Sequence, residues 1–176
     1  RVEGVLRRRA LRSAFVVFVS RALQELYVRK GIVDGVRTRV IYNIGPSPYT
    51  GAPLPRDGRT VLFVGKLSTG KGLGILYQAA ELLSKERPDV RFDVAGVQGV
   101  GFAPPPASVA DKFTFHGRLD AGDVQRLMLT RAVLAAPAIW PEPLSRVLLE
   151  AMSTRLPIVA TAVGGTSEAL EHESSA

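Results

Sequence analysis

The stretch that decides the fold is residues 61–77, VLFVGKLSTGKGLGILY. It opens with four apolar residues and no polar alternation, which is typical of a strand covered on both faces. A glycine-rich loop follows, and Leu73, Leu76 and Tyr77 then begin a pattern with a period of 3.6 residues, which indicates a helix. A strand, a glycine loop and a helix in this order predict the first unit of a parallel α/β sheet.

The same alternation of short apolar runs and helical patterns continues on both sides of this stretch. A second helical pattern begins near residues 144–146. The stretch 45–58 is rich in Pro and Gly and predicts a linker. We therefore expect an α/β fold with a Rossmann-like, doubly wound parallel sheet. The expected strands are 14–19, 38–42, 60–64, 91–95, 113–116, 132–136 and 157–162.

Composition excludes several classes of protein. The chain has 176 residues, 46% of them hydrophobic, and no cysteine, which rules out disulfides, thiolate nucleophiles and zinc sites built on cysteine. The apolar run AFVVFV at 14–19 is too short to cross a bilayer and is not followed by a signal-peptide cleavage site. We expect a cytoplasmic protein.

The net charge of +7 lies in one part of the chain. Residues 1–40 hold ten Lys and Arg against three Asp and Glu, whereas residues 41–176 hold thirteen of each. Such a basic arm is most often a solvated helix face. We expect at most weak contact with an anionic membrane surface, which would make the protein peripheral there, and no specific nucleic-acid recognition.

The loop from Gly65 to Lys71 nearly matches a phosphate-binding P-loop. It reads G-x-x-x-x-G-K, and its lysines suit a phosphate. The next residue is Gly72, where a P-loop needs the Ser or Thr hydroxyl that binds magnesium. The sequence thus favours phosphate binding over nucleotide hydrolysis, and a glycine turn with two surface lysines is the structural alternative. The later glycine cluster at 96–101 predicts a plain turn.

Two glutamates, Glu142 and Glu150, accompany the helix that begins near 144–146. Eight helical residues would separate them by about 12 Å. Paired carboxylates of a glycoside hydrolase lie roughly 5–9.5 Å apart, so this pair better fits two contacts on one extended ligand. The structural alternatives are a partner for the helix dipole at Glu142 and an exposed helix residue at Glu150.

Four motifs between residues 60 and 170 resemble, in order, those of a known family. They are VLFVGKLSTGKG, FTFHGRL, WPEPLSRVLLEAM and PIVATAVGGTSEAL. Together they resemble the C-terminal domain of the group 1, or family 4, retaining glycosyltransferases, which have the GT-B fold. The resemblance implies a remnant of the N-terminal acceptor domain at 1–45, a linker at 46–58 and a donor-binding domain at 59–176 that is truncated at its end.

The resemblance also implies a role for each matching residue. Lys66 and Lys71 would grip the donor diphosphate, Glu142 would lie beside the donor sugar, and Glu150 would bind the ribose. The remaining donor-binding positions are Gly65 in the first loop, Gly117, Arg118 and Leu119 at the base, and the amides of Leu144 and Ser145.

The implied reaction is retaining transfer of a hexosyl group from a UDP-, GDP- or ADP-sugar. The acceptor would be a glycan, a lipid or a small molecule, no metal or other cofactor is expected, and the isolated chain is expected to be inactive. A P-loop-like NTPase, a non-catalytic nucleotide-binding module and a sugar-nucleotide epimerase of GT-B architecture are the alternatives.

The sequence departs from the family pattern at several positions. Leu144-Ser145 stands where the family usually has Phe-Gly, and Lys66 stands where Arg is frequent. Arg155 occupies the position of a glycine that commonly ends the helix, which predicts strain in a left-handed cap. A Pro-Pro-Pro run at 104–106 replaces a helix.

Overall fold

The computed structural model describes residues 11, 14–34 and 37–170. These residues form two compact units: the larger comprises Gly45–Trp140 and Arg146–Thr161, and the smaller comprises residues up to Ile44, Pro141–Ser145 and residues from Ala162 on. The arginine run at 7–9 and the last six residues lie outside the described part. Within that part, no helix combines the length and the apolar character that a membrane span requires.

The larger unit is built on a five-stranded sheet in which all neighbouring strands are parallel. Its strand order is β5-β4-β3-β6-β7. Counted along the chain, this places the third, second, first, fourth and fifth strands side by side, which is the order of a doubly wound Rossmann-like sheet. The predicted fold class is confirmed, and each strand lies where an apolar run predicted it: β3 at Thr60–Val64, β4 at Arg91–Ala95, β5 at Phe113–Gly117, β6 at Val133–Ala136 and β7 at Ile158–Ala160.

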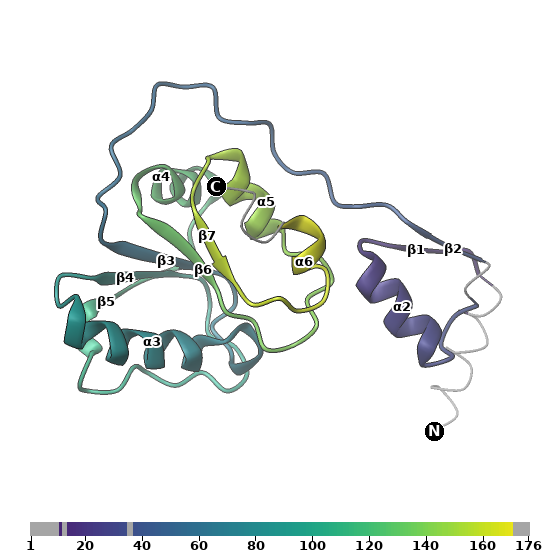
Figure 1. The fold of residues 1–176 in the computed structure, drawn as a ribbon, viewed down its shortest axis with the longest axis horizontal. Coiled ribbons are helices and arrows are strands. Elements are labelled where there is room, and N and C mark those ends of the chain that lie inside the picture. The colour runs from purple at the N-terminus through teal and green to yellow at the C-terminus, as the bar shows by residue number, and fades with distance from the viewer. Residues whose placement is uncertain (1–10, 12–13, 35–36, 171–176) are drawn as a thin grey trace. The chain divides into compact units, whose positions relative to one another are not determined.

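Helices cover both faces of this sheet (Figure 1). The helix α3 lies on one face, and α4 and α5 lie on the other. No helix forms across the Pro-Pro-Pro run, as its composition predicted. The bounds are Leu73–Glu86 for α3, Ala121–Thr130 for α4 and Arg146–Ser153 for α5, with short 3-10 turns at Thr69–Lys71 and Ala110–Lys112.

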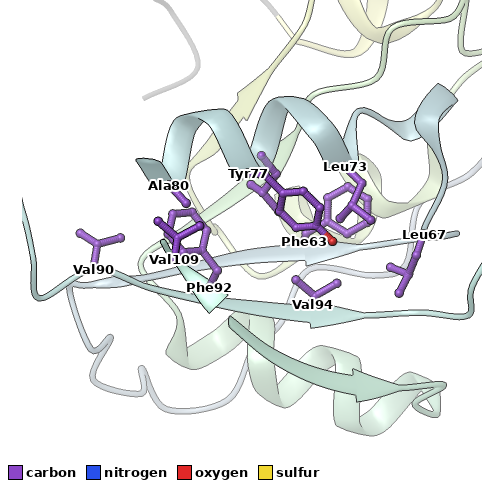
Figure 2. Close-up of a cluster of buried hydrophobic side chains, with 10 residues drawn as sticks. Phe63, Leu67, Leu73, Tyr77, Ala80, Val90, Phe92, Val94 and Val109 are labelled. Carbon is purple, nitrogen blue, oxygen red and sulfur yellow. The ribbon is translucent and has the colours of Figure 1, made fainter. Parts of the chain in front are cut away.

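The core of the larger unit lies between the sheet and α3. Phe63 points from β3 toward Tyr77 and Leu73 on that helix, and Phe92 lies beside Ala80 at its other end (Figure 2). Phe92 stacks on Phe113 with ring centroids 4.7 Å apart. Each such buried side chain stabilises the fold by about 1.5–3 kcal/mol, so this face holds the loop ends of the strands in fixed positions.

The smaller unit contains a strand, a helix and a strand, which are β1 (Val16–Phe18), α2 (Arg21–Arg29) and β2 (Thr38–Val40). The two strands are parallel neighbours. Ser20 caps α2 by accepting from the amide of Leu23 at 3.3 Å. Phe18 packs edge-on against Tyr27, with centroids 5.4 Å apart.

A glutamate from the far end of the chain also caps α2. The carboxylate of Glu168, in the short helix α6 (Thr166–Ala169), accepts from the amides of Arg21 at 2.9 Å and Ala22 at 2.8 Å. The Tyr42 hydroxyl donates to it at 2.8 Å. Partial burial would raise the pKa of Glu168, but these donors outweigh burial and lower it. The segment after Ala162 is thereby joined to the N-terminal strand–helix–strand.

The predicted linker, 46–58, contains no helix or strand, yet it is attached to the rest of the larger unit at Tyr49 and near Arg56. The amide of Tyr49 donates to the carbonyl of Ser153 at 2.8 Å. The guanidinium of Arg56 donates to three carbonyls at the ends of α4 and α5. These are Met128 at 2.6 Å, Arg131 at 3.0 Å and Thr154 at 2.9 Å.

Candidate functional site

The strand order creates a switch point between β3 and β6. These strands are neighbours in the sheet, but the chain leaves β3 toward α3 and leaves β6 toward α5, on opposite faces (Figure 1). Doubly wound sheets bind their ligands beyond the carboxyl ends of the strands at such a point. The two loops that leave the sheet here are Gly65–Gly72 and the segment from Pro137 to Trp140.

Backbone contacts lock these two loops together. The amide of Ile139 donates to the carbonyl of Gly70 at 3.0 Å. Gly72 has a left-handed backbone with φ of 79°, and a Cβ there would lie 1.7 Å from the carbonyl oxygen of Pro137. Only glycine fits this position, both because of its φ and because of the contact. The course of the first loop is therefore fixed by its neighbour.

The amides of the first loop are largely used within the protein. Leu67 donates to Val97 at 2.8 Å, Thr69 to Val100 at 3.4 Å, Lys71 to Ser68 at 3.2 Å and Gly72 to Thr69 at 2.9 Å. A P-loop instead presents successive amides to its phosphate. The positive charge of this loop consequently comes from its lysine side chains. Together with the missing Ser or Thr hydroxyl at Gly72, this argues against a P-loop NTPase.

The two lysines lie in different surroundings. Lys66 is exposed, and its aliphatic chain passes over Gly99, where a Cβ would lie 2.7 Å from the Lys66 Cε. The turn at 96–101 thus has a packing role, since Gly99 leaves room for the lysine. Lys71 is half-buried, and its ammonium lies 6.0 Å from the ring centroid of Trp140.

Glycines end the three strands on this side of the sheet. The amide of Gly65, after β3, donates to Ala95 at 2.9 Å, and the amide of Gly96, after β4, donates to Gly117 at 2.7 Å. Gly117 has φ of 67° and turns the chain into the next loop. In that loop Arg118 is exposed and Leu119 is half-buried. The predicted base-binding loop therefore lies at the same edge of the sheet as the lysine loop.

Glu150 lies in α5, which begins at Arg146 as the sequence predicted. Its side chain is half-buried, which differs from the exposed helix residue of the structural alternative. The span from Glu142 to Glu150 is helical only from Arg146 on, so the separation of about 12 Å for a continuous helix does not apply.

The end of α5 is strained as predicted. Arg155 has φ of 54° and is the sole non-glycine with a positive φ among the described residues. Its amide donates to Met152 at 3.0 Å and that of Leu156 donates to Ala151 at 3.0 Å, which is the Schellman pattern. A left-handed conformation costs roughly 1–2 kcal/mol in a residue with a Cβ.

Glu142 belongs to the smaller unit, on a loop as predicted, and is buried at 6% exposure. Its carbonyl accepts from the amide of Gly165 at 2.7 Å. Gly164 has φ of 55°, and a Cβ there would lie 2.1 Å from the same carbonyl oxygen. The paired glycines of the sequence AVGG are therefore needed for the segment at Gly164–Gly165 to pack against the backbone of the Glu142 loop.

The residues after Glu142 are also held within the smaller unit. Leu144 is buried at 7% exposure, and its carbonyl accepts from the Asn43 amide group at 3.4 Å. Ser145 is half-buried. Both residues precede the first residue of α5.

Comparison with known proteins identifies the family. The model of the family described as "Glycosyl transferases group 1" matches residues 52–176. The chain belongs to this family. Spore coat protein SA of Bacillus subtilis is 35% identical over 123 residues, which cover 64% of this chain and 33% of that protein. A D-inositol 3-phosphate glycosyltransferase of Arthrobacter is 30% identical over 118 residues, which cover 62% of this chain and 28% of that enzyme.

Solved structures of glycosyltransferases show the same fold. Alr3699/HepE of Anabaena, in complex with UDP-glucose, superposes with a TM-score of 0.72 at 23% identity, over 90% of this chain and 48% of that one. Sucrose-phosphate synthase of Thermosynechococcus elongatus gives a TM-score of 0.70 at 25% identity, over 93% and 45%. The GT-B relationship is thereby shown, and the chain spans about a third of the length of the curated relatives it matches.

In this group 1 chain, the larger unit brings most of the predicted site residues to one edge of its sheet. These are Gly65, Lys66, Lys71, Gly117, Arg118 and Leu119, with Glu150 in the helix after the switch point. Glu142, Leu144 and Ser145 belong to the smaller unit.

Three features of the group 1 chain were not predicted. Trp140 contacts the lysine loop, and its place as the first residue of the motif that contains Glu142 was the available signal. Asp93, buried in β4, pairs with Arg131 at 2.6 Å and lies 3.2 Å from His116. Glu168 caps α2 across 146 residues of sequence. The last two depend on contacts between distant segments, which no local pattern in the sequence contains.

Proposed function

We propose that this chain is the donor-binding part of a glycosyltransferase that transfers a hexosyl group from a nucleotide-diphosphate sugar with retention of configuration. The observation that carries the proposal is the pair Lys66 and Lys71 on a loop fixed at the switch point, whose amides are engaged within the protein. Ammonium groups at that place neutralise charge that develops on a leaving diphosphate. A metal ion is not required for this step in our proposal.

The other residues take the remaining parts of the donor. Glu150 accepts from the ribose hydroxyls, and the loop of Gly117, Arg118 and Leu119 holds the base. Glu142 lies beside the sugar and its anomeric carbon, with the amides of Leu144 and Ser145 donating to sugar or phosphate oxygens. UDP-glucose in the HepE complex supports a nucleotide sugar as the ligand.

The donor in this proposal is a UDP-, GDP- or ADP-sugar, and the acceptor is a glycan, a lipid or a small molecule. The 176 residues alone should bind the donor without transferring its sugar, because closure of two domains around both substrates is needed to exclude water. We also propose a cytoplasmic location, with at most a weak and salt-sensitive contact with anionic lipid.

The test is calorimetric titration of the chain with a panel of UDP-, GDP- and ADP-sugars and the bare nucleotides. Lys71→Ala removes a charge-assisted contact worth about 1.5–3 kcal/mol, so the affinity for the preferred nucleotide should fall roughly ten- to hundredfold. Lys85→Ala, an exposed lysine in α3, removes the same charge elsewhere and should change little. Unchanged affinity in Lys71→Ala with the fold intact would show that this loop does not bind the diphosphate.

Repeating the titration with EDTA separates this proposal from an NTPase. Donor affinity should be insensitive to the chelator. A loss of affinity that Mg²⁺ restores would instead favour metal-dependent nucleotide binding at this loop.

A further inference from the structure

Trp140 is placed to act on the lysine loop. It lies beyond the carboxyl end of β6, at the switch point, and is 51% exposed. Its neighbour Ile139 is bonded to the carbonyl of Gly70, so the backbone that carries the indole is fixed against the loop. It is also the single tryptophan of the chain.

The indole of Trp140 lies beside two consecutive residues of the loop, Gly70 and Lys71. A Cβ built on Gly70 would lie 3.3 Å from the Trp140 Cδ2 and 3.4 Å from its Cε3. The next residue, Lys71, places its ammonium 6.0 Å from the ring centroid, which is within range of a cation–π interaction. One aromatic side chain therefore contacts both the backbone and the charge of the anion-binding turn.

We propose that Trp140 is a positioning residue that holds the ammonium of Lys71 at the switch point for the donor diphosphate. This inference rests on the proposed function. A lysine has a flexible four-carbon stem, and ordering it on binding costs affinity. Contact with the indole orders the stem beforehand. When a diphosphate binds, the stronger charge-assisted hydrogen bonds to its oxygens draw the ammonium from the ring.

The first arm of the test measures affinity. Trp140→Leu should weaken binding of UDP and of inorganic pyrophosphate about two- to fivefold, since it removes the cation–π contact and keeps an apolar side chain. Trp140→Phe keeps an aromatic face and should restore binding to within about twofold of wild type. Circular dichroism and thermal melting of both variants are the controls for folding.

The second arm uses the fluorescence of Trp140 itself. Titration with UDP should change its emission, with a midpoint equal to the calorimetric Kd. Lys71→Met should change the emission of the free chain, because the ammonium no longer faces the ring, whereas Lys85→Met should not. Gly70→Ala, which presses a methyl group on the indole, should shift the emission as well.

The possible results separate the two proposals. If wild type binds neither nucleotides nor pyrophosphate, both the donor function and this inference fail. If wild type binds normally and Trp140→Leu binds equally well, or more tightly, the donor function stands and the positioning role is overturned. Binding without any change in emission, together with an emission unaffected by Lys71→Met, overturns it too.

Discussion

The loop of Gly65–Gly72 and the loop around Glu142 both carry charged residues, but they expose them to solvent to different extents. Both are held by glycines that touch a carbonyl of another segment: Gly72 against Pro137 in the larger unit, and Gly164 against Glu142 in the smaller one. On the first loop the lysines are exposed or half-buried, whereas the carboxylate residue of the second is buried at 6% exposure. Glycine contacts thus fix the backbone in both loops, whereas the exposure of the charged residue differs between them.

The largest effect should come from closing the space at Gly72. Gly72→Ala places a methyl group on the Pro137 carbonyl oxygen at a strained φ, so we expect a loss of unfolding free energy on the order of 4 kcal/mol or more. Gly74→Ala is the matched control. Gly74 lies in α3, and a Cβ there would have no neighbouring atom within 4 Å, so alanine should raise stability by up to about 1 kcal/mol. Urea unfolding of both variants measures the difference, and similar stabilities would break the comparison.

Substitutions at Glu150 and Glu142 should have different effects on the binding of the bare nucleotide and of the nucleotide sugar. Glu150→Gln should weaken the bare nucleotide and the nucleotide sugar alike, by about 1.5–3 kcal/mol, because a charged acceptor of the ribose is lost. Glu142→Gln should affect the nucleotide sugar more than the bare nucleotide, because its proposed contact is with the sugar. In a longer, active form of the enzyme it should also lower kcat, since contacts at the reacting centre strengthen as charge develops.

Calorimetry with UDP and its sugar, or with the preferred base, measures this pair. Equal losses for both ligands in Glu142→Gln would place that residue away from the sugar. Circular dichroism serves as the control, because the side chain that changes is buried.

A smaller effect should follow from relieving the strain at Arg155. Arg155→Gly keeps the Schellman hydrogen bonds and removes the cost of a Cβ at φ of 54°, so stability should rise by about 1 kcal/mol. Arg155→Ala removes the charge and keeps the Cβ, and should leave stability nearly unchanged. If alanine stabilises as much as glycine, the strain lies in the side chain and not in the backbone.

The smallest effect should be a pH dependence in the smaller unit. Burial acts to raise the pKa of Glu168, but the amide and hydroxyl donors outweigh it, and the pKa is lowered in the fold. A lowered pKa contributes stability that is present above the usual glutamate pKa of about 4.3 and is lost as the pH falls through the folded value. Melting temperatures from about pH 7 to about pH 3 should therefore fall more steeply for wild type than for Glu168→Gln. Parallel curves would contradict the lowered pKa.

The sequence predicted the fold well because the fold depends on local patterns. Apolar runs located the seven strands of the described residues, the 3.6-residue period located α3 and α5, and the missing glycine at Arg155 located a strained cap. The loops at the switch point followed from the strand–loop–helix order. The contact between Lys71 and Trp140 could not be predicted in this way, because the two residues are far apart along the chain and only the sheet order brings them together.

The site itself was predicted from motif order and remains a prediction at the level of individual roles. The spacing of residues in the motifs could not predict the burial of Glu142. The sequence places this residue on a loop, but its low exposure depends on the Gly164–Gly165 segment more than twenty residues later. Likewise, the use of loop amides by carbonyls at Val97 and Val100 depends on how the neighbouring strand ends.

The hydrogen bonds of Arg56 decide how much of the segment 46–58 can act as a linker. Because Tyr49 and Arg56 are both hydrogen-bonded to the larger unit, the stretch without such attachments is limited to the few residues between them. Residues inserted between these two attachment points would therefore lengthen a segment within the larger unit.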